Sequence, residues 1–114
     1  MTPRQDGALA NPERGEATIR VNGRDHLLRP SFTALVAAEG ELGPLFALVE
    51  RAGEGRLALS EIATLFWFCL ADRAALGPNT TGREAMGDAV VAMGLSAAAK
   101  PLRALLVQIL QGRG

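Results

Sequence analysis

The chain has 114 residues, its 12 Lys and Arg residues balance 12 Asp and Glu residues, and 48% of its residues are hydrophobic but only 4% aromatic. Zero formal net charge argues against the basic surface that binds nucleic acid or an anionic membrane, so we expect neither partner. A core built from Leu, Ala and Val favours helices, and this length supports one domain.

Residues 1–15, MTPRQDGALANPERG, are rich in Pro, Gly and charge, and we predict that they form a flexible arm. They contain no apolar run suited to a signal peptide, and the longest apolar run of the chain, IATLFWFCLA, is about half a membrane span. The single cysteine, Cys69, fits a reducing compartment. We therefore expect a cytoplasmic protein with one domain over residues 16–112.

A β-hairpin is predicted over residues 16–29. Alternation of apolar and polar residues at positions 17–21 is typical of a strand, and Asn22-Gly23 suits a type I′ turn. The register that follows pairs Ala17 with Leu28, Ile19 with His26, and Arg20 with Asp25 as an ion pair. Because an isolated hairpin is marginal in water, we expect it to lie against the helices or to pair with another chain.

Four or five short helices are predicted after the hairpin, so the expected fold is α+β, mostly α, in one compact domain. Pro30 ends the second strand and Ser31 is a natural N-cap for the first helix. Its apolar side would comprise Phe32, Leu35, Val36 and Leu42. Gly43-Pro44 ends this helix, unless it already ends at Gly40. The apolar stripe expected for the second helix is Leu45, Leu48, Val49 and Ala52. Gly53 and Gly55 are expected to end this helix.

The third helix, capped by Ser60, is apolar on nearly all sides, which is typical of a central helix or of one half of an interface. Its stripe is Ile62, Leu65, Phe66 and Cys69, with Trp67, Phe68 and Leu70 off it. A capping box of Thr81 and Glu84 opens the fourth helix, which Gly94 ends. Its inward residues are Met86, Ala89, Val90 and Met93. Because Pro101 suits a first turn, the last helix is predicted to begin near Ala98 or Ala99, with Leu102, Leu105, Leu106 and Ile109 on one face.

The reactive side chains do not form a catalytic or metal-binding set. Cys69 lies in the middle of an apolar helix and His26 in a strand, and one His with one Cys cannot complete a metal site. Glu39 falls within the first helix's stripe, where it caps, pairs with an Arg or marks an interface edge. We therefore expect no enzyme, no metal and no cofactor.

Two stretches of the sequence resemble a known family. They are NPERGEATIRVNGRDHLLRPSFTALVAAEGELG and, after it, LFALVERAGEGRLALSEIATLFWFCLADRA. The features are Arg14-Gly15-Glu16, the strand and turn, Leu28-Arg29-Pro30-Ser31-Phe32, Glu39 with Leu42-Gly43, and Leu59-Ser60-Glu61. In their order and spacing the chain resembles the small tail protein of bacterial gene transfer agents, which is grouped with siphophage tail assembly chaperones.

The resemblance implies a mostly helical, non-enzymatic protein that binds the tape-measure protein and keeps it soluble until tail tube subunits polymerise. The alternative that it leaves open is a structural, tube-associated component retained in the particle, because members are also described as tail tube proteins. One hairpin argues against a tube wall of β-sandwich subunits. The tail tube protein and further copies of this chain remain additional candidate partners.

Surplus apolar residues outside the helix stripes either complete the core or form a surface for another protein, and the sequence leaves both alternatives open. On the second alternative, a helical domain could lay an apolar surface against a helical partner. The residues predicted to make this contact are Trp67, Phe68 and Leu70, helped by Leu106 and Ile109.

Overall fold

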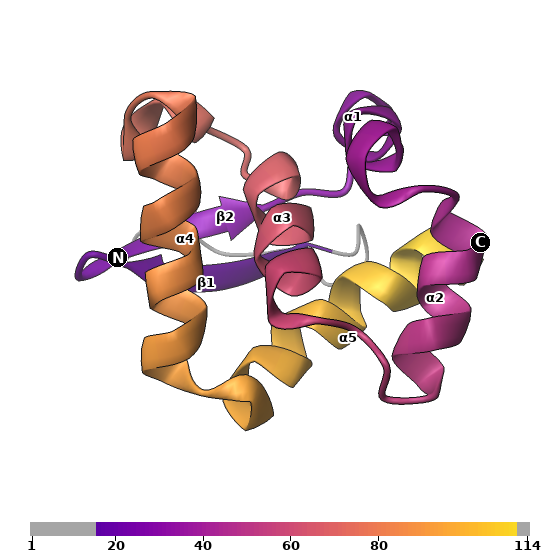
Figure 1. Cartoon of the computed structure of the whole chain (residues 1–114). Coiled ribbons are helices and arrows are strands. Elements are labelled where there is room, and N and C mark those ends of the chain that lie inside the picture. The colour runs from indigo at the N-terminus through magenta and orange to yellow at the C-terminus, as the bar shows by residue number, and fades with distance from the viewer. Residues whose placement is uncertain (1–15, 112–114) are drawn as a thin grey trace, which may run out of the picture.

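The computed structural model describes residues 16–111, so the predicted arm at residues 1–15 lies outside the described residues. Figure 1 shows a small two-stranded sheet surrounded by helices. The strands are β1 (Ala17–Val21) and β2 (Arg24–Leu28). The helices are α1 (Phe32–Leu42), α2 (Leu45–Gly53), α3 (Leu59–Cys69), α4 (Asn79–Met93) and α5 (Leu95–Gln111), with a 3-10 turn at Arg73–Leu76. The predicted fold class is confirmed.

The hairpin has the predicted register, in which Ile19 lies opposite His26 and Arg20 opposite Asp25. Asn22 and Gly23 have φ values of 54° and 79°, as a type I′ turn requires. The Arg20 guanidinium donates to Asp25 over 3.0 Å on the exposed side. On the other side of β1, Ala17, Ile19 and Val21 are buried, so the hairpin lies against the helices.

The far edge of β2 is held by the segment that follows α3. The amide of Arg29 donates to the Cys69 carbonyl over 2.6 Å, and the amide of Ala71 donates to the Leu27 carbonyl over 2.9 Å. The Arg29 side chain also pairs with the buried carboxylate of Glu16, 2.9 Å from Nε to Oε2. This edge of the hairpin is therefore fixed to the body of the domain.

Helix α1 begins as predicted but buries a different side. The Ser31 hydroxyl accepts a hydrogen bond from the Ala34 amide over 3.2 Å, which confirms the N-cap. The expected apolar side is wrong for two of its four residues, because Phe32 is 84% exposed and Val36 49% exposed. The buried residue is Ala38, with Leu35 and Leu42 packed partly against the core. The contact with α3 decides which row of side chains faces inward.

The segment between α1 and α2 shows what Glu39 does. Helix α1 continues past Gly40 to Leu42 and is capped by Gly43. The predicted end at Gly43-Pro44 is therefore confirmed, and the alternative end at Gly40 is wrong. The Glu39 carboxylate accepts a hydrogen bond from the Leu45 amide over 3.0 Å. Of its three expected roles, Glu39 therefore has the capping role, at the start of α2, which itself has no side-chain cap from Pro44.

Three predicted helix starts are wrong. Helix α3 begins at Leu59 after Ala58, so Ser60 lies inside its first turn and does not cap it. Helix α4 begins at Asn79 after Pro78, ahead of the expected cap at Thr81. Helix α5 begins at Leu95 directly after Gly94, which places Pro101 inside it. Each of these helices begins a few residues before its local start signal, because helix boundaries are less sharply encoded than the helices themselves.

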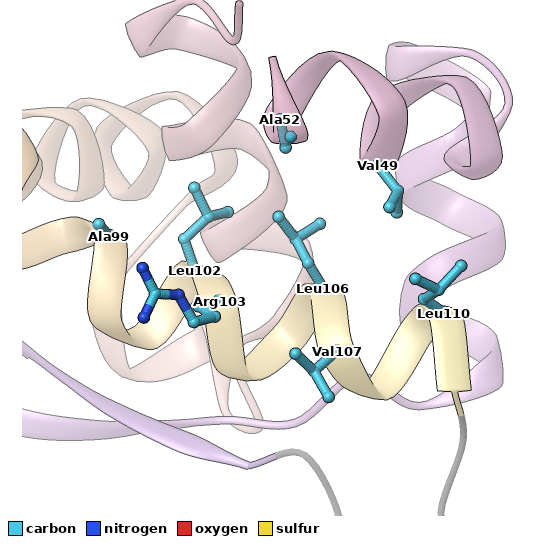
Figure 2. Close-up of a pocket in the computed structure, with 9 residues that line it drawn as sticks. Val49, Ala52, Ala99, Leu102, Arg103, Leu106, Val107 and Leu110 are labelled. Atoms are coloured by element: carbon cyan, nitrogen blue, oxygen red, sulfur yellow. The ribbon is translucent and has the colours of Figure 1, made fainter. Parts of the chain in front are cut away.

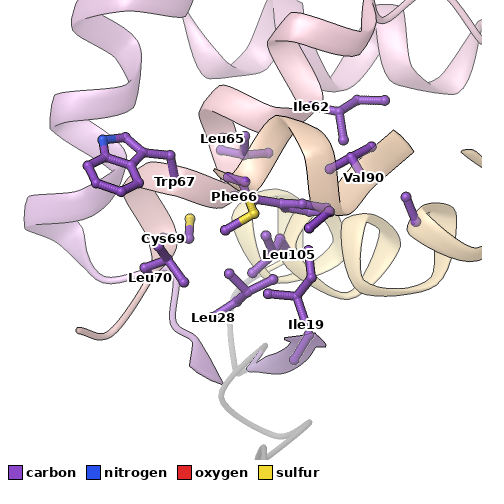
Figure 3. Close-up of a cluster of buried hydrophobic side chains, with 14 of the residues drawn as sticks. Ile19, Leu28, Ile62, Leu65, Phe66, Trp67, Cys69, Leu70, Val90 and Leu105 are labelled. Atoms are coloured by element: carbon purple, nitrogen blue, oxygen red, sulfur yellow. The ribbon is translucent and has the colours of Figure 1, made fainter. Parts of the chain in front are cut away.

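The core surrounds α3, which contacts α1 and α4 (Figure 1). Figure 3 shows that its side chains meet residues from both strands and from α4 and α5. The fully buried side chains include Ile19, Leu28, Leu65, Phe66, Cys69, Met86, Val90 and Leu105. Trp67 and Leu70 are buried as well. Helix α3 is apolar on nearly all sides because other elements cover most of them.

Candidate protein-binding groove

A groove of about 410 Å³ lies between α2 and α5. Figure 2 shows side chains of α5 pointing toward Val49 and Ala52 of α2. Its lining is apolar apart from one arginine: Val49, Ala52 and Gly53 from α2, and Ala99, Leu102, Arg103, Leu106, Val107 and Leu110 from α5. We name these residues the α2–α5 groove.

The groove exists because α5 has two apolar rows, one packed in the core and one facing α2. Ala98 and Leu105 are buried in the core and hold α5 in place. Leu106 and Leu110 lie on the neighbouring row and face α2 across the groove (Figure 2). Leu110 is 53% exposed, so the groove keeps an apolar surface that the described residues leave open to solvent. We therefore treat the groove as a candidate interaction site.

The five side chains predicted to contact a partner do not form one surface. Trp67 and Leu70 are only 4% and 6% exposed and belong to the core. Phe68, Leu106 and Ile109 are partly buried, and of these Leu106 lines the α2–α5 groove. Partner binding by the five residues stays a prediction, and in the folded chain Leu106 is the member best placed for it.

Phe68 belongs to a cluster that connects three helices. The Arg83 guanidinium lies 5.0 Å from the centre of the Phe68 ring, and that of Arg73 lies 5.9 Å from it. Arg83 of α4 also binds Glu41 of α1 with two hydrogen bonds, one of them 2.9 Å long. The Arg83 hydrogen bond lowers the pKa of the Glu41 carboxyl below its ordinary value of 4.5. This cluster holds α1, α3 and α4 together.

One wall of the groove belongs to α2 and was not predicted. Val49 and Ala52 were expected only as part of the apolar stripe of their helix, and they line the groove. A signal was present in α5, where Ala99, Arg103, Leu106 and Leu110 recur at helical spacing as a second row beside the core row. What the spacing could not show is that α2, some 50 residues earlier in the chain, lies opposite this row.

The described residues do not assemble a reactive site. Burial raises the pKa of the Cys69 thiol to about 12, so the thiol stays protonated at neutral pH. Within residues 16–111, His, Cys, Asp and Glu side chains form no group of three or more that could hold a metal ion. The α2–α5 groove offers an apolar surface with one arginine, which suits contact with another protein better than chemistry.

In the described range, no single helix has the length and apolar character needed to cross a membrane. Two pairs of consecutive helices reach that length and composition only jointly, and they are bent by 76° and 118°.

The fold is that of a small, mostly helical domain, and its α2–α5 groove is a candidate contact surface for another protein. A family model described as "Phage tail tube protein, GTA-gp10" matches residues 14–112. Because the match spans most of the chain, the chain belongs to this family of phage tail proteins. No curated protein and no solved structure matches the chain at a significant level.

Proposed function

We propose that this chain is a non-enzymatic component of a gene transfer agent tail that contacts neighbouring tail proteins through the α2–α5 groove. The observation that carries the proposal is the open apolar groove in a chain whose family is described as a phage tail tube protein. That description favours a component retained at the tube. Because residues 16–111 contain a single two-stranded sheet, we place it beside the tube or at its end.

A second candidate function is that of a tail assembly chaperone. A groove between two helices with leucines along one wall accepts the apolar side of an amphipathic helix. This geometry favours a protein that holds the helical tape-measure protein in the cytoplasm until the tube polymerises. The two candidates differ in whether the chain remains in the finished particle.

Quantitative mass spectrometry of purified particles, with the cell lysate as expression control, distinguishes the two candidates. We expect the chain in a fixed ratio to other tail proteins, as a retained component requires. Clear expression in the lysate together with absence from particles would instead assign the chaperone function.

The role of the groove is tested by complementing a deletion strain with Leu110→Asp. We expect the yield of tailed particles to fall about tenfold or more, because a carboxylate in an apolar contact loses its water without compensation. Phe32→Asp is the matched control, because Phe32 is also exposed but lies on α1, outside the groove. Equal particle yields from both variants and the natural chain would remove the groove from the proposed function.

A further inference from the structure

The α2–α5 groove carries positive charge that the described residues do not neutralise. Helix α5 contains Lys100 and Arg103 but no acidic residue, and Arg103 lines the groove. Neither cation forms a hydrogen bond or ion pair with another described residue, whereas Arg29, Arg51 and Arg83 each bind a carboxylate. A purely apolar occupant would take water from the Arg103 guanidinium without replacing it. The groove therefore favours an occupant that brings a carboxylate.

The charge and the apolar surface are ordered along α5. Ala99, Arg103, Leu106 and Leu110 follow one another at intervals of four, three and four positions, which places them on one side of the helix. The row thus carries one cation, Arg103, in its first half, with Lys100 beside it, and leucines in its second half. An occupant that runs parallel to α5 needs the corresponding order, acidic first and apolar afterwards.

Helix α4 of this same chain presents that order on its outer side. Glu84, Asp88 and Val91 are exposed, and their spacing of four and three positions places them on one side of α4. Val91 is 64% exposed, and the exposed Leu95 lies just beyond the Gly94 corner. Glu84 and Asp88 have no hydrogen bond or ion pair with another residue in the described range. We name Glu84, Asp88 and Val91 the α4 ridge.

We propose that the α4 ridge of a second copy of this chain docks in the α2–α5 groove. In a parallel alignment Asp88 of one copy meets Arg103 of the other, and Val91 meets Leu106. Glu84 then lies near Lys100. The ion pairs replace the water that the groove loses, and the apolar residues bury one another. The inference rests on the proposed function for the use of the groove as a contact surface, and it names the neighbour.

The positions of the two surfaces determine how copies associate. Figure 1 shows α4 at one end of the molecule and α2, with the last turns of α5, at the other end. Because ridge and groove are different surfaces of the same chain, each copy retains one unused surface after docking. Such a head-to-tail contact produces a closed ring when the rotation between copies closes and a filament when it does not.

Sedimentation velocity of the purified full chain, over a range of concentrations, tests the proposal. We expect self-association that Arg103→Glu and Asp88→Arg each weaken about tenfold or more, because each variant brings like charges together. An equimolar mixture of the two variants should regain association, since both contacts of an alternating assembly then join opposite charges. Asp72→Arg is the control, because Asp72 is exposed and lies outside both surfaces, and it should associate like the natural chain.

Several results would overturn the proposal. A natural chain that stays monomeric, or variants that associate equally well, would show that the ridge does not use the groove. A chain lacking residues 1–15 that associates more strongly than the full chain would assign the groove to that segment. If the natural chain is monomeric but Arg103→Glu still stops tail assembly in cells, the groove binds another protein. That result would contradict this inference but support the proposed function.

Discussion

At the scale of single residues, Gly82 decides how closely α4 approaches α3. A Cβ atom at this position would lie 2.6 Å from Trp67 Cη2 and nearer still to Cζ3. Trp67 is buried and its indole cannot move without disturbing the core. The absence of a side chain at Gly82 is therefore the reason that the one tryptophan of the chain fits beneath α4.

We expect Gly82→Ala to reduce the free energy of unfolding by about 1–3 kcal/mol, because the added methyl group overlaps the Trp67 ring. Gly87→Ala in the same helix is the matched control. A Cβ there would meet nothing within 4 Å, so this variant should gain about 0.5–1 kcal/mol through helix propensity. Urea unfolding of both variants measures the difference, and a stabilised Gly82→Ala variant would contradict the close contact.

At the scale of elements, the start of α3 depends on a residue inside the helix. Ala58 occupies the N-cap position and has no side chain that can cap. The Glu61 carboxylate accepts a hydrogen bond from the Ala58 amide over 2.8 Å, and it also pairs with Arg51 of α2 at 2.8 Å. Glu61 thus replaces half of a capping box and connects α3 to α2.

Ala58→Ser should stabilise the domain by about 0.5–1 kcal/mol. Ala58 already has the extended backbone of an N-cap, and a serine hydroxyl there could accept a hydrogen bond from an unpaired backbone amide of the first turn. Ser60→Ala, by contrast, should be neutral or slightly stabilising, since Ser60 lies within the first turn of α3. Thermal unfolding compares the two variants. A loss of stability in Ser60→Ala would mean that Ser60 caps α3 after all.

The sequence predicted which elements form but not how each helix is rotated. The hairpin register and the Ser31 cap follow from adjacent residues, so local rules were sufficient. For α1, periodicity predicted one apolar side with Phe32, Leu35, Val36 and Leu42, of which Leu35 and Leu42 pack against the core. The small Ala38 side chain faces inward in the folded chain, while Phe32 remains exposed. That choice depends on the packing of α1 against α3, which periodicity does not contain.

At the scale of the whole molecule, ion pairs connect helices that are distant in the sequence. Glu41 of α1 pairs with Arg83 of α4, and the Arg83 hydrogen bond lowers the pKa of Glu41. The pKa of Glu61 is lowered too, first by the Ala58 amide and then by Arg51. In both cases the folded chain favours the charged carboxylate more strongly than the unfolded chain does.

This difference sets the direction of the pH dependence. A lowered pKa in the folded chain contributes stability above the ordinary value of 4.5, and that stability is lost as the pH falls through the folded-state value. We expect the urea midpoint to decrease as the pH falls from neutral to below 4.5. Because both carboxylates are near solvent, the effect is modest, and the double variant Glu41→Gln with Glu61→Gln should show a smaller decrease. An unchanged pH profile in the double variant would contradict this assignment.

The candidate site was the part least accessible from the sequence. The surplus of apolar residues suggested an interface, but the side chains chosen from α3 and its C-cap include Trp67 and Leu70, which are buried. Counting apolar residues on one helix cannot tell a face covered by other helices from an open one. The groove arises where α2 and α5 meet, and only the tertiary arrangement brings Val49 and Leu106 to one surface.

The attachment of the hairpin to residues 69–71 has a consequence for how the chain is made. A ribosome releases β1 and β2 before the helices, and the backbone partners of Leu27 and Arg29 follow some 40 residues later. Helices α4 and α5, which also pack against β1, follow later still. The inner side of the hairpin therefore stays uncovered during most of translation, and a product truncated before α5 would expose Ile19 and Val21 to proteases.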